Sequence, residues 1–187
     1  MKQLIYALMG LCIFPAMGFS QHPSEISGEY QHGFGKSYNT NSIGLRYEGY
    51  DNNNSRNTNN SNKGSWSLGV NYTFSSLRAA NETAKGRGIG VFAGYRYGLK
   101  YGISGNLYGG IRTAFTFSKD APGSQYSLFT PSLEFGYHYT SQDFGKGGAF
   151  TSFVALGYDI KMAADGKAKG VHEGAIFSPG ISVGYRF

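Results

Sequence analysis

The sequence predicts an all-β protein: an eight-stranded antiparallel up-and-down β-barrel that spans a membrane and follows a cleavable signal peptide. Three observations support this prediction. The 187 residues include 29 glycines, 15 tyrosines and 14 phenylalanines, a composition that disfavours helix bundles. The chain begins with an apolar segment typical of exported proteins. After that segment, large apolar side chains alternate with small polar ones along most of the chain.

Residues 1–20 are predicted to be a secretory signal peptide. A positively charged start is followed by an almost wholly apolar run from Leu4 to Phe19. Gly18 and Ser20 then place small residues three and one before a cut, as signal cleavage requires. An uncleaved anchor or a lipid attachment at Cys12 remains the alternative. Cleavage would leave residues 21–187 as one barrel domain without a thiol.

Eight segments of this domain show the two-residue period of strands with one apolar and one polar face. They cover about 26–34, 43–47, 66–74, 89–99, 103–117, 129–139, 150–160 and 177–187. The polar faces carry mainly Gly, Ser, Thr and Asn, with isolated charges. A soluble sandwich would turn a charged face outward, whereas a membrane barrel encloses its polar face and closes to leave no unpaired edge. The barrel is therefore favoured, and a soluble secreted β-sandwich or lectin-like binder is the rival.

A weak internal repeat supports the strand count. Its pattern is glycine, apolar, cationic or histidine, aromatic, and it begins at Gly44, Gly94, Gly136 and Gly184. The copies fall on the second, fourth, sixth and eighth segments, which run in the same direction in an up-and-down barrel. Their aromatic residues are therefore expected to form a girdle at one membrane interface. Tyr72, Phe74, Phe115, Phe117 and Tyr158 would form the opposite girdle.

Charged residues on the polar faces are expected to point into the lumen. They are Arg46, Glu48, Arg96, Arg112, Glu134, His138, Asp159 and Arg186. An isolated charge in a narrow barrel is costly, so Glu48 and Glu134 should pair with some of the arginines. Eight strands leave an interior that side chains just fill. The prediction is a polar plug, and a narrow gated conduit is the alternative.

With these features the chain resembles the small eight-stranded bacterial outer-membrane barrels, the group typified by OmpX and the transmembrane domain of OmpA. The signal peptide, the alternating strands and the final strand carry the resemblance. In that family, a terminal Phe preceded by alternating apolar residues resembles the signal read by the outer-membrane assembly machinery; the matching residues here are Ile181, Val183, Tyr185 and Phe187. The resemblance implies a monomer in the outer membrane of a Gram-negative bacterium, with both termini in the periplasm. It implies a structural, envelope or surface-interaction role.

The family topology also assigns the connections between strands. Outer loops are expected at about 35–42, 75–87, 119–125 and 161–171, and a tight periplasmic turn at Gly98–Gly102. The outer loops would be mildly basic. We expect them to be ordinary solvated loops of a barrel in contact with membrane lipid, and contact with the anionic groups of lipopolysaccharide is the alternative. The cations that make the loops basic are Lys85, Arg87, Lys119, Lys161, Lys167 and Lys169. The asparagine-rich segment 51–63 falls on the periplasmic side, where the turns of the family are short. Either this turn is unusual, or the first strand is placed wrongly.

No enzymatic activity and no cofactor are expected. Outer-membrane lipid A deacylases carry a His-x-Ser pair with a nearby acid, whereas His138 is followed by Thr140, and Ser152 and Phe153 stand where an acid would be needed. The histidines outside the predicted lumen have no ligand spacing that predicts a metal site. The formal net charge of +6 comes from dispersed cations of an exported chain, which argues against a nucleic-acid partner.

Overall fold

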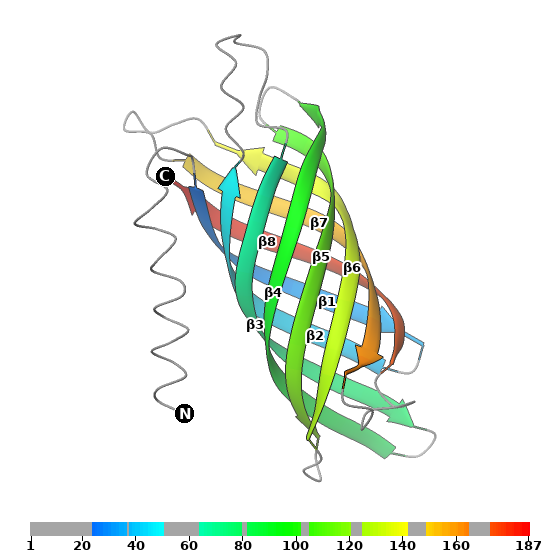
Figure 1. Cartoon of the computed structure of the whole chain (residues 1–187). Coiled ribbons are helices and arrows are strands. Elements are labelled where there is room, and N and C mark those ends of the chain that lie inside the picture. Colours follow the sequence, from blue (N-terminus) through cyan, green and yellow to red (C-terminus); the bar gives the residue numbers. More distant parts are fainter. Residues whose placement is uncertain are drawn as a thin grey trace, which may run out of the picture.

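The computed structural model describes residues 24–36, 38–50, 64–79, 82–101, 105–120, 125–141, 149–164 and 173–187. These residues form one closed barrel in which consecutive strands are antiparallel neighbours and β1 pairs with β8 (Figure 1). The strands are β1 (Ser24–Gly35), β2 (Tyr38–Tyr50), β3 (Gly64–Ala79), β4 (Glu82–Tyr101), β5 (Gly105–Asp120), β6 (Gln125–Thr140), β7 (Ala149–Ala163) and β8 (Gly174–Arg186). The predicted eight-stranded antiparallel barrel is confirmed.

Backbone hydrogen bonds join the two ends of the sheet. The Ser24 amide donates to the Phe187 carbonyl at 3.1 Å, and the Phe187 amide donates to the Ser24 carbonyl at 2.9 Å. We call the end of the barrel that holds these two residues the termini end, and the opposite end the hairpin end. No helix among the described residues is long and apolar enough to cross a membrane.

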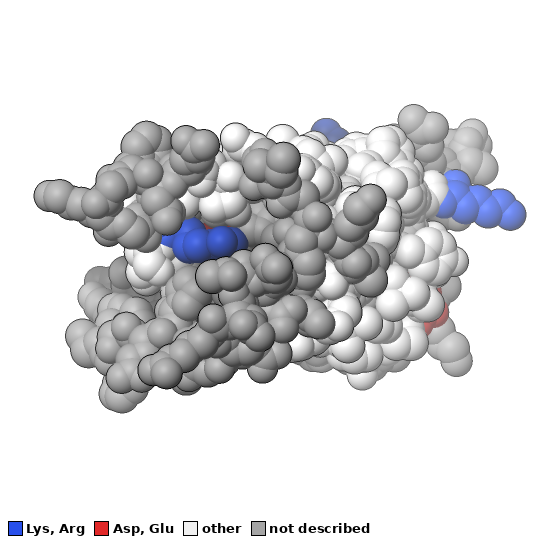
Figure 2. All heavy atoms as spheres, turned by 90° about the horizontal axis from the view of Figure 1, so that it is seen from above, with Lys and Arg blue, Asp and Glu red and all other residues white. Residues whose placement is uncertain are grey.

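The outer surface of the barrel is apolar. Side chains such as Ile111, Leu133 and Val183 are 61%, 63% and 65% exposed, and similar residues alternate along every strand. The side chains between them point inward and are mostly small or polar. In the view of Figure 2 most of the described surface belongs to uncharged residues, with only a few Lys, Arg, Asp or Glu side chains visible. This arrangement is stable in hydrocarbon and unfavourable in water, so it excludes the soluble β-sandwich.

The registers place the four repeats at the termini end. Tyr47 and Tyr185 flank Ile26 near the start of β1, and Tyr97 lies opposite the first residue of β3. Tyr139 likewise lies opposite the first residue of β5. One aromatic residue of each repeat therefore lies near the same rim. Because β1 pairs with both of its neighbours, the alternative that the first strand was misplaced is wrong; segment 51–63 lies outside the described residues.

Several predicted connections are wrong because the strands extend beyond the apolar belt. Strand β2 begins at Tyr38, inside the predicted loop 35–42, and β3 pairs with β4 as far as Ala79 and Glu82, inside the predicted loop 75–87. Backbone pairing continues there although the side chains no longer alternate between apolar and polar. Lys85, Arg87, Lys119 and Lys161 consequently lie on strands; Lys167 and Lys169 lie outside the described residues.

The turn predicted at 98–102 is also displaced. Strand β4 continues to Tyr101, and a bulge between Gly98 and Lys100 leaves Leu99 without a partner in β5. An extra residue in one strand locally increases the twist of the pair, and a bulge has no signature in the apolar alternation. The apolar alternation therefore ends at residue 99, whereas β4 continues to Tyr101.

Candidate functional site

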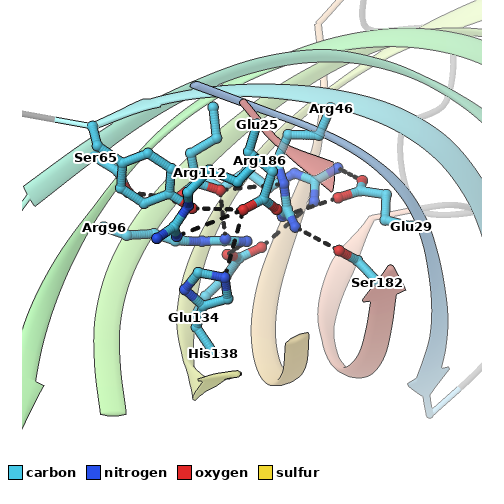
Figure 3. Close-up of polar contacts among 12 residues, drawn as sticks. Glu25, Glu29, Arg46, Ser65, Arg96, Arg112, Glu134, His138, Ser182 and Arg186 are labelled. Carbon is cyan, nitrogen blue, oxygen red and sulfur yellow. Dashed lines mark hydrogen bonds and ion pairs between the residues drawn. The ribbon is translucent and has the colours of Figure 1, made fainter. Parts of the chain in front are cut away.

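The lumen holds a closed ring of alternating positive and negative side chains, which we call the charge ring (Figure 3). Its members are Glu29, Arg46, Glu48, Arg96, Glu134 and Arg112. They come from β1, β2, β4, β5 and β6, and all point inward because they occupy the polar positions of the alternation. Every side chain of the ring is at most 7% exposed.

Arg46 links two of the carboxylates. Its Nη1 lies 3.2 Å from Glu29 Oε2, and its Nε lies 3.6 Å from Glu48 Oε2. Arg46 Nη2 also donates to Ser182 Oγ at 2.8 Å, which ties the ring to β8. Glu48 Oε1 accepts a hydrogen bond from Ser65 Oγ at 2.5 Å. The Arg46 guanidinium therefore contacts both β1, through Glu29, and β8, through Ser182, which are the two strands that close the barrel.

Arg96 and Arg112 complete the ring through Glu134. Arg96 Nη1 lies 2.9 Å from Glu48 Oε2, and its Nη2 lies 3.4 Å from Glu134 Oε2. Arg112 Nη1 lies 3.5 Å from Glu134 Oε1, and its Nη2 donates to Glu29 Oε1 at 2.6 Å. Each arginine thus contacts two glutamates and each glutamate contacts two arginines. The ring is neutral as a whole, which satisfies the requirement that buried charges be paired.

Inward-facing aromatic rings fill the space around the guanidinium groups. Arg112 Cζ lies 3.6 Å from the centre of the Phe92 ring. Arg96 Cζ lies 4.7 Å from the Tyr108 ring and 4.5 Å from the Phe153 ring, and Phe153 also contacts Arg46 at 4.6 Å. Guanidinium groups over aromatic faces gain a cation–π attraction while the rings exclude water. The cross-section at this level is therefore occupied by side chains.

A second cluster, centred on Glu25, lies between the charge ring and the termini end. Tyr50 Oη donates to Glu25 Oε2 at 2.8 Å, and Arg186 Nη2 lies 3.8 Å from the same oxygen. His138 Nε2 lies 3.5 Å from it, and the His138 ring stacks on Phe153 at 3.9 Å between centroids. His138 thus lies between an acid and an aromatic ring inside the barrel.

The cavities beside the ring are small. The space among Glu29, Arg46, Arg96 and Glu134 measures about 10 Å³, no more than a single water needs. Toward the hairpin end lies a cavity of about 50 Å³ with Arg112 among its lining residues. Hydroxyl and amide groups form most of its wall, so it is a polar space. The structure thus shows a short polar space on one side of the ring and side chains across the ring itself.

Asp159 lies apart from the charge ring. It lines the 50 Å³ cavity together with Lys161, which points inward, and with the hydroxyl-bearing residues Ser132 and Ser178. Of the predicted lumen residues, Arg46, Glu48, Arg96, Arg112 and Glu134 are in the ring, and His138 and Arg186 are in the Glu25 cluster. The structure therefore divides the predicted network into three groups.

Sequence reasoning missed Glu25 and Glu29, which supply one carboxylate to each cluster. The first strand alternates weakly, because glycine and histidine stand at two of its outward positions. The exposed positions of Ile26, Tyr30 and Phe34 nevertheless define the period, and Glu25 and Glu29 fall on the opposite face. This signal was available in the sequence.

Solved structures of outer-membrane barrels share this architecture. Ail, the attachment invasion locus protein of Yersinia pestis, matches with 15% identity over 89% of this chain in two structures. The structure of Ail in complex with the heparin analogue sucrose octasulfate gives a TM-score of 0.51, with 99% of the Ail chain covered. The other Ail structure gives a TM-score of 0.50, with 98% of the Ail chain covered. The N-terminal β-barrel domain of Pseudomonas aeruginosa OprF gives a TM-score of 0.45 and 12% identity, over 89% of this chain and 100% of that chain.

The chain has the fold of the small outer-membrane barrels. This confirms the resemblance at the level of the fold, which is what an identity of 15% supports. No protein-family model and no curated protein matches the sequence.

Proposed function

We propose that this chain is an integral outer-membrane barrel with a structural, envelope or surface-interaction role, and that the charge ring seals its lumen. The apolar outer surface and the fold shared with Ail support the location. The observation that carries the seal is the closed cycle of six ion pairs across the lumen. A permeating solute would have to separate buried charges at this level, which is costly because each would lose its partner.

The proposed partners are the lipid of the outer membrane, lipopolysaccharide and the outer-membrane assembly machinery. Ile181, Val183 and Tyr185 are exposed on the outer face of β8, and Phe187, the residue after this strand, is also exposed, so all four are accessible to that machinery. Lys85, Arg87 and Lys119 are exposed near the hairpin end, where the family topology places the outer leaflet. Their charge favours the phosphates of lipopolysaccharide.

The proposed role is non-catalytic. His138 points into the lumen, where it contacts Glu25 and stacks on Phe153. Tyr139 between His138 and Thr140 is exposed on the outer face, so the histidine lies on the side of the wall away from the acyl chains. An enzyme that modifies membrane lipid would need its general base on the lipid side. A change in the mass of lipid A on expression would contradict this part of the proposal.

Location and sealing are tested separately. The full chain, expressed in a Gram-negative host, should fractionate with the outer membrane, require detergent for extraction and migrate differently on gels before and after heating. In planar bilayers the purified barrel should show no steady conductance. The variant Arg112→Ala, which opens the charge ring, should give measurable current. A steady conductance of the unaltered barrel would favour the narrow conduit and would contradict the seal.

A further inference from the structure

An apolar groove of about 640 Å³ crosses the outer face of the barrel over β8, β1, β2, β3 and β4. It follows two adjacent rows of outward side chains that lie directly opposite one another across the strands. The row nearer the termini end contains Val183, Gly28, Leu45 and Val70. The row nearer the hairpin end contains Ile181, Tyr30, Ile43, Tyr72 and Ile89.

Gly28 produces the hollow in this surface. Its neighbours across the strands, Leu45 and Val183, carry exposed apolar side chains, whereas Gly28 has none. A Cβ placed at Gly28 would meet no atom within 4 Å. The gap is therefore unoccupied by the protein, and it lies within the belt that faces acyl chains.

A row in which four of five residues are polar lies two residues further toward the hairpin end, about 7 Å beyond the groove, and we call it the polar row. It contains His32, Asn41, Phe74, Arg87 and Lys119, which again lie directly opposite one another. Asn41 Oδ1 lies 2.6 Å from His32 Nδ1 and accepts a hydrogen bond from Tyr30 Oη at 2.7 Å. Tyr30 thus connects the wall of the groove to the polar row through a hydrogen bond.

Arg87 and Lys119 place two like charges opposite each other on exposed outward positions. Directly opposed like charges destabilise a strand pair. Within the described part of the chain, no ion pair of either residue is present. A phosphate between the two cations would remove their repulsion and would accept charge-assisted hydrogen bonds from both.

We propose that the groove holds one acyl chain of lipid A, with a lipid A phosphate bound between Arg87 and Lys119. The groove supplies an apolar surface that runs from Gly28 on β1 to Ile89 on β4. Arg87 lies two residues beyond Ile89 on the same strand and is paired with Lys119 of β5, so the cations lie at the β4 end of the groove. A lipid with both a phosphate and an acyl chain matches both features. This inference rests on the proposed function, which places the hairpin end in the outer leaflet, and it specifies which strands the lipid contacts.

The test measures lipid A binding to the full-length barrel, purified from outer membranes and freed of lipid in mild detergent. Native mass spectrometry during titration with purified lipid A should show one tightly bound molecule per barrel. G28L fills the groove, and R87Q with K119Q removes the phosphate contacts; each should weaken binding by about tenfold. A93L is the matched control, because Ala93 is also exposed on the outer face but does not line the groove; it should bind as the unaltered chain does.

Equal binding by G28L and the unaltered barrel, or equal losses in G28L and A93L, would overturn the inference. Phosphatidylglycerol that binds as tightly as lipid A would overturn the assignment to lipid A. The heat-dependent gel shift verifies that each variant is folded. In the double variant R87Q with K119Q both replaced side chains are exposed, so this variant leaves the packing inside the barrel unchanged. An unaltered barrel found outside the outer membrane would instead refute the proposed function. Outer-membrane location with unchanged binding in both variants would refute this inference alone.

Discussion

Replacement of Arg112 by glutamine gives a quantitative test of the charge ring. Arg112 contacts Glu29 Oε1 at 2.6 Å and Glu134 Oε1 at 3.5 Å. With an effective dielectric constant of about 20, the two gross attractions are roughly 6 and 5 kcal/mol, most of which the desolvation of the charges offsets. Breaking buried pairs by removing one partner typically costs 3–5 kcal/mol. Because Glu29 keeps Arg46 and Glu134 keeps Arg96, we expect Arg112→Gln to lower the free energy of unfolding by about 3 kcal/mol.

The assay is urea unfolding of the barrel in lipid vesicles, followed by the fluorescence of Trp66, the single tryptophan of the chain. Trp66 lies on β3 and contacts Tyr47 of β2, so its emission reports on the integrity of the sheet. The double variant Arg112→Gln with Glu29→Gln restores a neutral lumen. We expect it to be more stable than the sum of the single losses implies, by about 1–3 kcal/mol. A loss below about 1 kcal/mol for Arg112→Gln, together with additive single effects, would refute a coupled ring.

Three further predictions concern the walls and the final strand. Gly69→Val should lower the free energy of unfolding by about 1–3 kcal/mol in the same assay, because a Cβ there would overlap the Phe92 ring and the Leu45 carbonyl. Gly28→Ala is the control, because a Cβ there would meet no atom within 4 Å. Equal stability of the two variants would contradict the packing argument. Leu133→Lys should cost about 2–4 kcal/mol in vesicles, because its side chain faces hydrocarbon; an unchanged urea midpoint would argue that this face is in water. Phe187→Ala should reduce the amount of barrel in the outer membrane of living cells while the purified chain still refolds in detergent. Equal losses in both settings would assign Phe187 a purely structural role.

The strands were predictable because hydrocarbon on the outside and a filled lumen on the inside impose a strict two-residue period. That period placed Arg46, Arg96 and Arg112 inside the barrel without any knowledge of the fold. It did not reveal which carboxylate each arginine contacts, because such pairs depend on the registers of distant strands and on the reach of flexible side chains. Asp159 illustrates this limit: it points inward as expected, but its place on β7 puts it near Lys161, away from the ring. The extension of β2–β5 beyond the belt was unpredictable for a different reason, since pairing in water needs only backbone hydrogen bonds.

The order of the strands has a consequence for biogenesis. All six charged side chains of the ring belong to β1–β6, whereas closure of the barrel requires β8 to pair with β1. A nascent sheet of six strands can therefore neutralise its charges before the cylinder is shut, and insertion need not carry bare ions past the acyl chains. The addition of β7 and β8 would then close the barrel around ion pairs that have already formed.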